Sequence, residues 1–218
     1  MTKDEVLNKF KVLIDKNADI SFGGYPAFID AEIDMFISQA VHEVISNKYT
    51  GTQNQAGFEA NDKRIADLQG LIGTALILNP TATSIPNAVA FELPMDFWFY
   101  VDAYVKINGS TVYQVELTTH DIVKNFAVTH DNDPYIPVAK AVLEENNIVV
   151  YYDKHIVNSI DGLAMSYIYT PVIFTDDVLA KELEPLIDEI INRAVLIALE
   201  NIEAPRTETK AQLNSLQE

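Results

Sequence analysis

The sequence predicts an α+β fold, in which helices at the N- and C-terminal ends form a bundle around a β-rich central part. Apolar residues recur at helical spacing near both ends, whereas the middle contains short β-rich runs between turn residues. The chain has 218 residues, 48% of them apolar and 22% charged, so it can bury a core without disulfides. We expect N-terminal helices over 1–78, a β-rich part over 79–170, a C-terminal helix over 171–202 and an extended arm over 203–218.

Three helices are predicted in the N-terminal part. Residues 3–16 place apolar side chains at three- and four-residue steps, as an amphipathic helix does. Residues 27–48 carry a broader apolar arc, which indicates burial along most of the helix. Asp30, Glu32 and Asp34 lie in the first half of this range, where the helix dipole favours negative charge. Residues 61–72 complete the set, with Asn61 as the expected N-cap.

The central part is predicted to consist mostly of strands. Pro, Thr and Ser make residues 79–87 a connection, and Asn108-Gly109 between two β-rich runs indicates a hairpin. Glu145-Asn146-Asn147 predicts a second tight turn, and residues 119–129 a short helix. The expected strands cover 88–93, 97–108, 111–118, 140–143, 148–152 and 165–169. The aromatic start of the second of these runs also fits a buried helix.

The last predicted element is an amphipathic helix over 176–202. Thr175 or Asp176 would cap its N-terminus. Pro185 would either kink this helix or separate its first residues as a preceding turn. Residues 203–218 include only two large apolar side chains, so we expect a tail that becomes ordered on assembly.

Composition excludes several classes of protein. The chain carries 15 Lys and Arg against 32 Asp and Glu, a formal charge of −17, which argues against a protein that grips nucleic-acid phosphates. The absence of Cys excludes a disulfide scaffold and Cys-ligated zinc or iron–sulfur sites, and it fits a reducing compartment. The charged N-terminal segment is unlike a signal peptide, and no apolar stretch reaches the roughly 20 residues that span a bilayer.

The sequence contains no familiar catalytic or cofactor motif. It lacks a Walker loop, a G-x-G-x-x-G run and a G-x-S-x-G elbow, and His42-Glu43 is not followed by the second His of a zinc motif. Residues 130–133 resemble the start of a calcium loop but lack the Gly and the bidentate Glu that complete one. We therefore predict no catalytic residues, no bound metal and no cofactor.

Three stretches taken together resemble one protein family. Residues 25–51 continue a Gly-Gly-Tyr-Pro loop into a long helix and then Lys-Tyr-Thr-Gly. Residues 93–97 read Leu-Pro-Met-Asp-Phe before the aromatic run. Residues 167–209 include Tyr-Ile-Tyr-Thr-Pro and, as the most specific part, Leu-Glu-Asn-Ile-Glu-Ala-Pro-Arg. In this order they resemble the head-to-tail connector proteins (adaptor-ring, tail-tubular-A-like neck proteins) of short-tailed bacteriophages, and most closely those of crAss-like phages.

The resemblance implies a structural virion protein that is not an enzyme. Such proteins form homo-oligomeric rings, here expected to be dodecameric, beneath the portal, where they continue the DNA channel that serves viral DNA ejection. The arm of each subunit would pack against the portal or an adjacent neck or tail protein, and the particle would be assembled in the host bacterial cytoplasm. The expected partner-binding residues of the arm are Ala204, Pro205, Arg206, Thr207, Glu208 and Thr209.

The acidity of the chain fits such a channel, because an acidic wall repels DNA phosphates and leaves the DNA mobile. Genomic DNA would then pass without specific binding, and no membrane is involved. A solvated helix face explains the same charges equally well. The candidate channel-facing residues are Asp176, Asp177, Glu182, Glu184, Asp188 and Glu189.

Two other functions remain open at this point. One is a metal-assisted hydrolase built on His120, Asp121, His130, Asp131 and Asp133. The other is a carbohydrate-binding module that uses the Tyr-rich middle of the chain. Bound metal would favour the hydrolase, and a position at the distal tail rather than near the portal would favour the carbohydrate-binding module.

Overall fold

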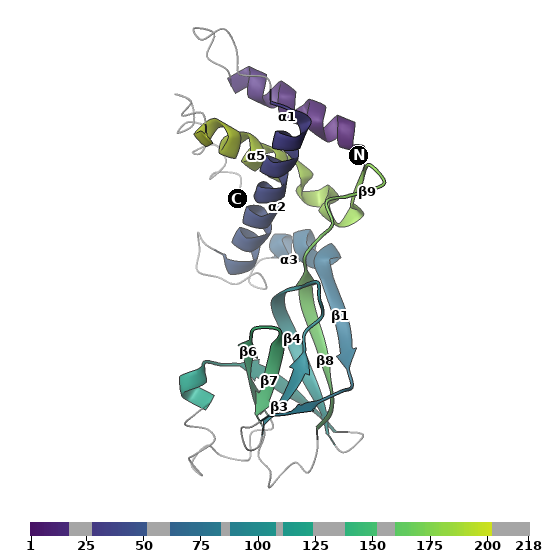
Figure 1. Cartoon of the computed structure of the whole chain (residues 1–218), viewed down its shortest axis with the longest axis vertical. Helices are drawn as coiled ribbons and strands as arrows, with labels where there is room; N and C mark the ends of the chain where they lie inside the picture. The colour runs from purple at the N-terminus through teal and green to yellow at the C-terminus, as the bar shows by residue number, and fades with distance from the viewer. Residues whose placement is uncertain are drawn as a thin grey trace. The chain divides into compact units, whose positions relative to one another are not determined.

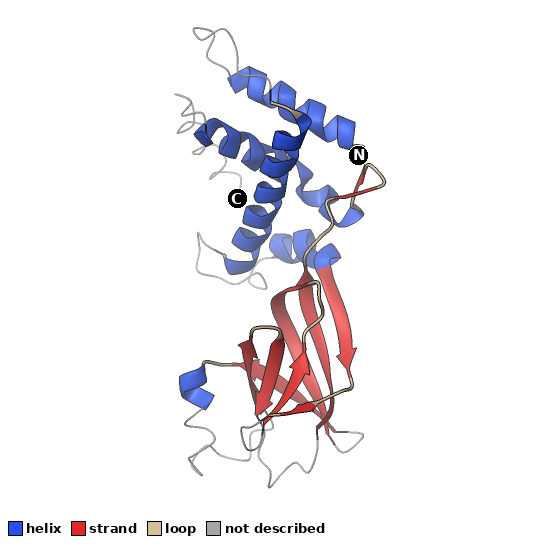
Figure 2. Ribbon diagram, in the orientation of Figure 1, coloured by secondary structure: helices blue, strands red, loops and turns tan. Residues whose placement is uncertain are grey.

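The computed structural model describes residues 1–17, 28–51, 62–83, 88–107, 111–123, 138–151 and 160–201. The chain divides into two compact units, one of residues 1–70 with 171–218 and one of residues 71–170. Helices dominate the first unit and strands the second (Figure 1; Figure 2). The predicted α+β class is confirmed, with helices at both ends of the chain and a curled sheet in its middle.

The helical unit is built around three long helices that pack against one another. They bury broad apolar stripes, and nearly every side chain along the middle of the last helix is shielded from solvent. The predictions over 3–16 and 27–48 are confirmed, with small shifts at the helix ends. The long helices are α1 (Lys3–Asn17), α2 (Asp30–Thr50) and α5 (Ile187–Asn201), and the short α3 (Asp62–Leu68) contacts α2 (Figure 1).

Local hydrogen bonds fix where these helices begin and end. The Thr2 hydroxyl accepts a bond from the Glu5 N–H at 3.3 Å, and the Glu5 carboxylate accepts one from the Thr2 N–H at 2.9 Å, which caps α1. At the start of α2 the Glu32 carboxylate accepts the Ile29 N–H at 3.0 Å. That helix ends at Gly51, whose φ of 67° lies in the left-handed region that favours glycine.

The C-terminal helix is shorter than the one predicted over 176–202. Residues 181–186 form the 3₁₀ helix η4 (Lys181–Leu186), and the α-helix begins only at Ile187. Pro185 lies inside η4, and a proline has no N–H for the hydrogen-bond ladder of an α-helix. The prediction that Pro185 separates a preceding turn is confirmed, whereas a helix that starts at residue 176 is wrong.

A hairpin of two short strands, β9 (Phe174–Thr175) and β10 (Val178–Leu179), precedes η4. Its turn consists of Asp176 and Asp177, whose φ values of 50° and 60° are the left-handed values that a two-residue hairpin turn favours. Asp tolerates these values better than most residues, because its short side chain can bond locally. The expectation that Thr175 or Asp176 caps a helix is therefore wrong.

The first residues of the chain extend this hairpin. The Lys3 N–H donates to the Asp177 carbonyl at 2.8 Å, and the Leu179 N–H donates to the Met1 carbonyl at 2.9 Å. An antiparallel bridge continues the pairing between these two bonds. The start of α1 and the segment that leads into α5 are thus joined directly.

The second unit is a curled sheet of eight strands (Figure 2). Neighbours pair antiparallel, except β5 and β6, which are parallel. The order is β1-β8-β4-β5-β6-β7-β3-β2, so β1 and β2 are the edges. The strands are β1 (Ile72–Ile77), β2 (Thr81–Ala82), β3 (Ala88–Glu92), β4 (Phe97–Ile107), β5 (Thr111–Leu117), β6 (Val138–Glu144), β7 (Asn147–Tyr151) and β8 (Ile160–Tyr169).

All six strands expected from the sequence are present, and the aromatic run is part of a strand rather than a helix. Both predicted hairpins are present, since Ile107 pairs with Thr111 and Glu144 with Asn147. Asn147, which was expected in the second turn, is the first residue of β7. The turn residues Asn108-Gly109 lie outside the described residues. Of the helix expected over 119–129, residues 120–123 are helical, and residues from 124 on lie outside the described part. In place of the helix expected over 61–72, α3 ends at Leu68, and its expected N-cap Asn61 lies outside the described residues. Strands β1, β2, β9 and β10 were not predicted.

Irregular pairing curves the sheet around its core. The register of β4 against β8 shifts between Phe97 and Phe99 and again between Tyr100 and Asp102. Such bulges bend a strand and increase its twist. One side of the sheet then encloses an apolar cluster. Its buried side chains are Phe91, Leu93, Ala103, Val105, Val115, Ala139, Ala141, Ile148, Val150, Ile160, Leu163, Met165 and Tyr167.

Candidate assembly surfaces

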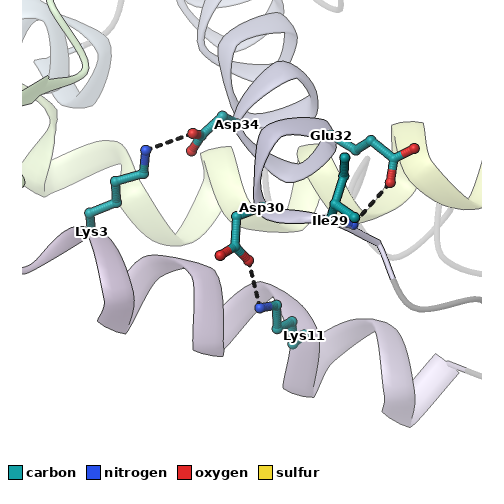
Figure 3. A network of polar contacts seen from close by, with 6 residues as sticks. All are labelled: Lys3, Lys11, Ile29, Asp30, Glu32 and Asp34. Carbon is teal, nitrogen blue, oxygen red and sulfur yellow. Dashed lines mark hydrogen bonds and ion pairs between the residues drawn. The ribbon is translucent and has the colours of Figure 1, made fainter.

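Ion pairs join α1 to the N-terminal turns of α2 (Figure 3). The Lys3 ammonium lies 2.6 Å from a carboxylate oxygen of Asp34, and the Lys11 ammonium lies 2.8 Å from one of Asp30. The hydrogen bond to Asp34 raises the pKa of Lys3, in spite of some desolvation. Because these groups are partly exposed, each pair contributes little to the stability of the fold. Their main effect is to orient the two helices.

A buried lysine joins three helices of the same unit. The Lys48 ammonium, on α2, lies 3.0 Å from a carboxylate oxygen of Asp67 on α3 and 2.8 Å from one of Glu189 on α5. Burial alone would lower the pKa of Lys48, but the hydrogen bonds to Glu189 and Asp67 outweigh it and raise that pKa. The lysine is therefore charged and doubly paired, and losing it would leave two carboxylates close together.

The six predicted acidic residues fall into two groups. Two are engaged in ion pairs between helices: Asp188 with Lys9 of α1, and Glu189 with Lys48 of α2. The other four precede α5, in the β9–β10 turn and in η4, and all but the half-buried Glu182 are exposed. The members of this second group are Asp176, Asp177, Glu182 and Glu184.

The other predicted residues are described only in part. The six arm residues, Ala204 to Thr209, lie outside the described part of the chain, as do His130, Asp131 and Asp133. His120 and Asp121 are exposed at the start of a short helical segment, and the His120 Nδ1 lies 3.8 Å from a Glu144 carboxylate oxygen. Among the described residues, no three His, Asp or Glu side chains gather in a way that could hold a metal ion. No described helix is long and apolar enough to cross a membrane.

Two of the stretches that carried the family resemblance meet in the sheet unit, a contact that the sequence did not predict. The Tyr167 hydroxyl donates to the Asp96 carboxylate at 3.1 Å, and the Thr170 N–H donates to the Asp96 carbonyl at 2.8 Å. The turn itself is closed by a 3.0 Å bond from the Phe97 N–H to the Pro94 carbonyl. The Leu-Pro-Met-Asp-Phe turn is thereby fixed against the end of β8, with its methionine side chain fully exposed.

Comparison with protein-family models gives a match over residues 1–172, to the family described as phage tail ring protein 3/4. The matched range includes α1, α2, α3 and every strand of the eight-stranded sheet. A search of curated proteins found no match.

Proposed function

Since this chain belongs to the phage tail ring protein 3/4 family of crAss-like phages, we propose that it forms a neck ring that joins the portal to the tail. That membership confirms the resemblance to ring proteins of crAss-like phages, and it makes the chain a structural, ring-forming component of the virion. The family match over 1–172 is the observation that carries the proposal. The ring is dodecameric, acts without catalysis and is assembled in the host bacterial cytoplasm.

The ring continues the channel through which genomic DNA leaves the particle. Four acidic residues within the nine positions 176–184 support this role. Three of them are exposed and the fourth is half-buried. Asp176 and Asp177 occupy the tip of a hairpin, from which their carboxylates can reach solvent. An acidic wall has no cations that could bind the phosphates and release their counterions, so the DNA slides past it. Asp188 and Glu189 contribute less, since lysines partly neutralise them, and a Glu184 carboxylate oxygen lies 3.9 Å from the N-terminal ammonium.

The arm supplies the contact with a neighbouring ring. Residues 204–209 follow α5 directly after its last turn and lie beyond the range that the family match covers. Their composition is poor in large apolar side chains, which suits a segment that binds along the surface of a partner rather than one that builds its own core. We assign this partner to the portal or to the adjacent neck protein.

Electron microscopy of assembled particles tests the proposed role. We expect a closed twelvefold ring between portal and tail, and native mass spectrometry of the purified chain mixed with portal should give the same stoichiometry. A chain that stays monomeric in the presence of its portal would contradict the proposal. Replacing Asp176 and Asp177 with Asn, which also tolerates the left-handed turn, and Glu184 with Lys tests the channel: ejection should slow, and most strongly at low salt, where phosphate binding is strongest. The control Asn8→Lys adds a cation at an exposed position of α1, in the same unit, without changing the acidic segment.

A further inference from the structure

An exposed apolar surface lies on the side of the sheet that faces away from the core. Four large side chains contribute to it, three on strands β1, β4 and β5 and one directly after β1, and between 41% and 64% of each is accessible to solvent. Hydrophobic side chains that are exposed singly need no explanation, but a contiguous group of them marks an interaction site. The members of this group, called here the outer-face patch, are Leu76, Leu78, Tyr104 and Val112.

The register of the sheet makes the patch contiguous. Leu76 and Tyr104 both pair with Ala164 of β8, one from each side, so only a methyl group separates them. In the next row Leu78 packs over Gly162: a Cβ added to that glycine would lie 3.1 Å from a methyl carbon of Leu78. Small residues at the centre and large ones at the rim make a shallow apolar surface.

The fourth member lies in the same row as Leu78. Gly162 pairs with Lys106 of β4, and Lys106 pairs with Val112 of β5. Lys106 is the charged residue of these two rows, and Asp102, which is hydrogen-bonded to the Tyr104 hydroxyl, balances it in the adjacent row. The surface is therefore close to neutral on a chain whose formal charge is −17. A second acidic chain can therefore approach this surface without the repulsion that acts elsewhere.

The patch continues onto an edge of the sheet that pairs with no further strand among the described residues. Strand β1 pairs with β8 on one side, in unbroken register, and residues 72–78 contain neither a charged residue nor a proline. Proteins usually protect such edges with Lys, Pro, bulges or short strands, because an open edge accepts another strand. The opposite edge of this sheet follows that rule: β2 has two residues and comes directly after Pro80.

We infer that the outer-face patch and the free edge of β1 form one side of the contact between neighbouring copies of this chain in the ring. The inference rests on the proposed function, in which copies of this chain form a closed ring. In a ring each copy must offer two different surfaces, one to each neighbour. The occupant is a second copy rather than a basic protein, because a basic partner would favour the acidic surfaces of the chain over this nearly neutral one.

The chain contains no Cys, which allows a clean cross-linking experiment. Leu76→Cys is labelled with a benzophenone maleimide and irradiated, and Ile122→Cys serves as the matched control. Ile122 lies in the same unit and has similar exposure (50% against 64%) but is outside the patch. We expect ladders of covalently joined copies from Leu76→Cys and few from Ile122→Cys.

In parallel, Leu76→Lys should weaken association of the copies by about tenfold or more, as loss of an apolar anchor does, and Ile122→Lys should not.

The possible outcomes separate this inference from the proposed function. If the wild-type chain forms rings, but Leu76→Lys assembles normally and the two Cys variants cross-link equally, the assigned surface is wrong and the ring remains. If no copies associate or cross-link under any condition, both are wrong. If Leu76→Cys captures only added portal and never a second copy, the patch faces another ring and the assignment to a copy of this chain is overturned. Both side chains are largely exposed, so the variants should fold.

Discussion

The Tyr167 hydroxyl donates a 3.1 Å hydrogen bond to the Asp96 carboxylate and so joins two positions that lie 71 residues apart in the sequence. The Tyr167 ring is buried, and its centre lies 5.8 Å from that of Phe97, the first residue of β4. Desolvation, together with the bond to Asp96, raises the pKa of Tyr167. This contact fixes the turn before β4 to the end of β8.

Replacing Tyr167 with Phe should destabilise the sheet unit. The ring and its packing remain, but the hydrogen bond is lost and the Asp96 carboxylate falls back on solvent, so we expect a loss of about 1 kcal/mol in the free energy of unfolding. Urea denaturation of the whole chain measures it. Tyr113→Phe, on a half-buried tyrosine of the same sheet, is the matched control and should change stability by less than about 0.5 kcal/mol. Equal losses in the two variants would argue against a specific bond to Asp96.

Replacing Lys48 with Met should be among the most damaging single changes in the helical unit. It leaves the half-buried Asp67 and Glu189 carboxylates without their cation, which typically costs about 3 kcal/mol. Thermal unfolding monitored by circular dichroism measures the loss. Lys11→Met removes a lysine from the exposed pair with Asp30 and should cost about 1 kcal/mol at most.

Restoring neutrality around the substituted lysine distinguishes lost charge pairing from lost packing. With Lys48→Met in place, Asp67→Asn and Glu189→Gln remove the unpaired charges while they keep the shape of both side chains. We expect these two changes to recover most of the lost stability. A triple variant that is no more stable than Lys48→Met alone would show that the packing of the lysine stem, rather than its charge, holds α2, α3 and α5 together.

Stability should fall at alkaline pH, and the residues responsible can be identified. The folded pKa of Lys48 lies above its ordinary value of 10.5, and that of Tyr167 above 10.0. The folded state therefore holds these protons more tightly, so this stabilisation is complete below about pH 10 and is lost as pH rises through the raised values. Denaturation between pH 8 and pH 11 measures the decline. Tyr167→Phe and the neutral triple variant at position 48 should each flatten it, and an unchanged slope in both would contradict the assignment.

The helices and most strands could be predicted because their signals are local. The apolar spacing over 27–48 places α2 almost where it lies, and turn residues separate the strands of the sheet. Strand β1 was missed, because a continuous apolar run such as residues 71–78 fits a buried helix as well as a strand. The start of α5 was placed too early, because Asp176 and Asp177 look like N-terminal helix acids but occupy a left-handed turn.

The contacts between distant segments could not be predicted from spacing. Nothing near Lys48 indicates that Asp67 and Glu189 converge on it, since helix packing in three dimensions decides that. The outer-face patch likewise depends on the register of four strands. The Asp96–Tyr167 contact is an intermediate case: family resemblance drew attention to both stretches, but only the fold brings them together.

Deleting residues 204–218 should separate stability from assembly. This segment contains two basic and two acidic residues, so its removal leaves the net charge at −17, and electrostatic repulsion between copies stays the same. It also removes few large apolar side chains, so the free energy of unfolding should change by less than about 0.5 kcal/mol. Docking to the portal or the adjacent ring should weaken strongly. Sedimentation of mixtures measures it. The control is a chain in which residues 204–218 keep their composition but are shuffled in order. If the shuffled chain docks as tightly as the wild type, the arm acts only as a tether. Unchanged docking by the deletion variant would exclude the arm as a partner-binding segment.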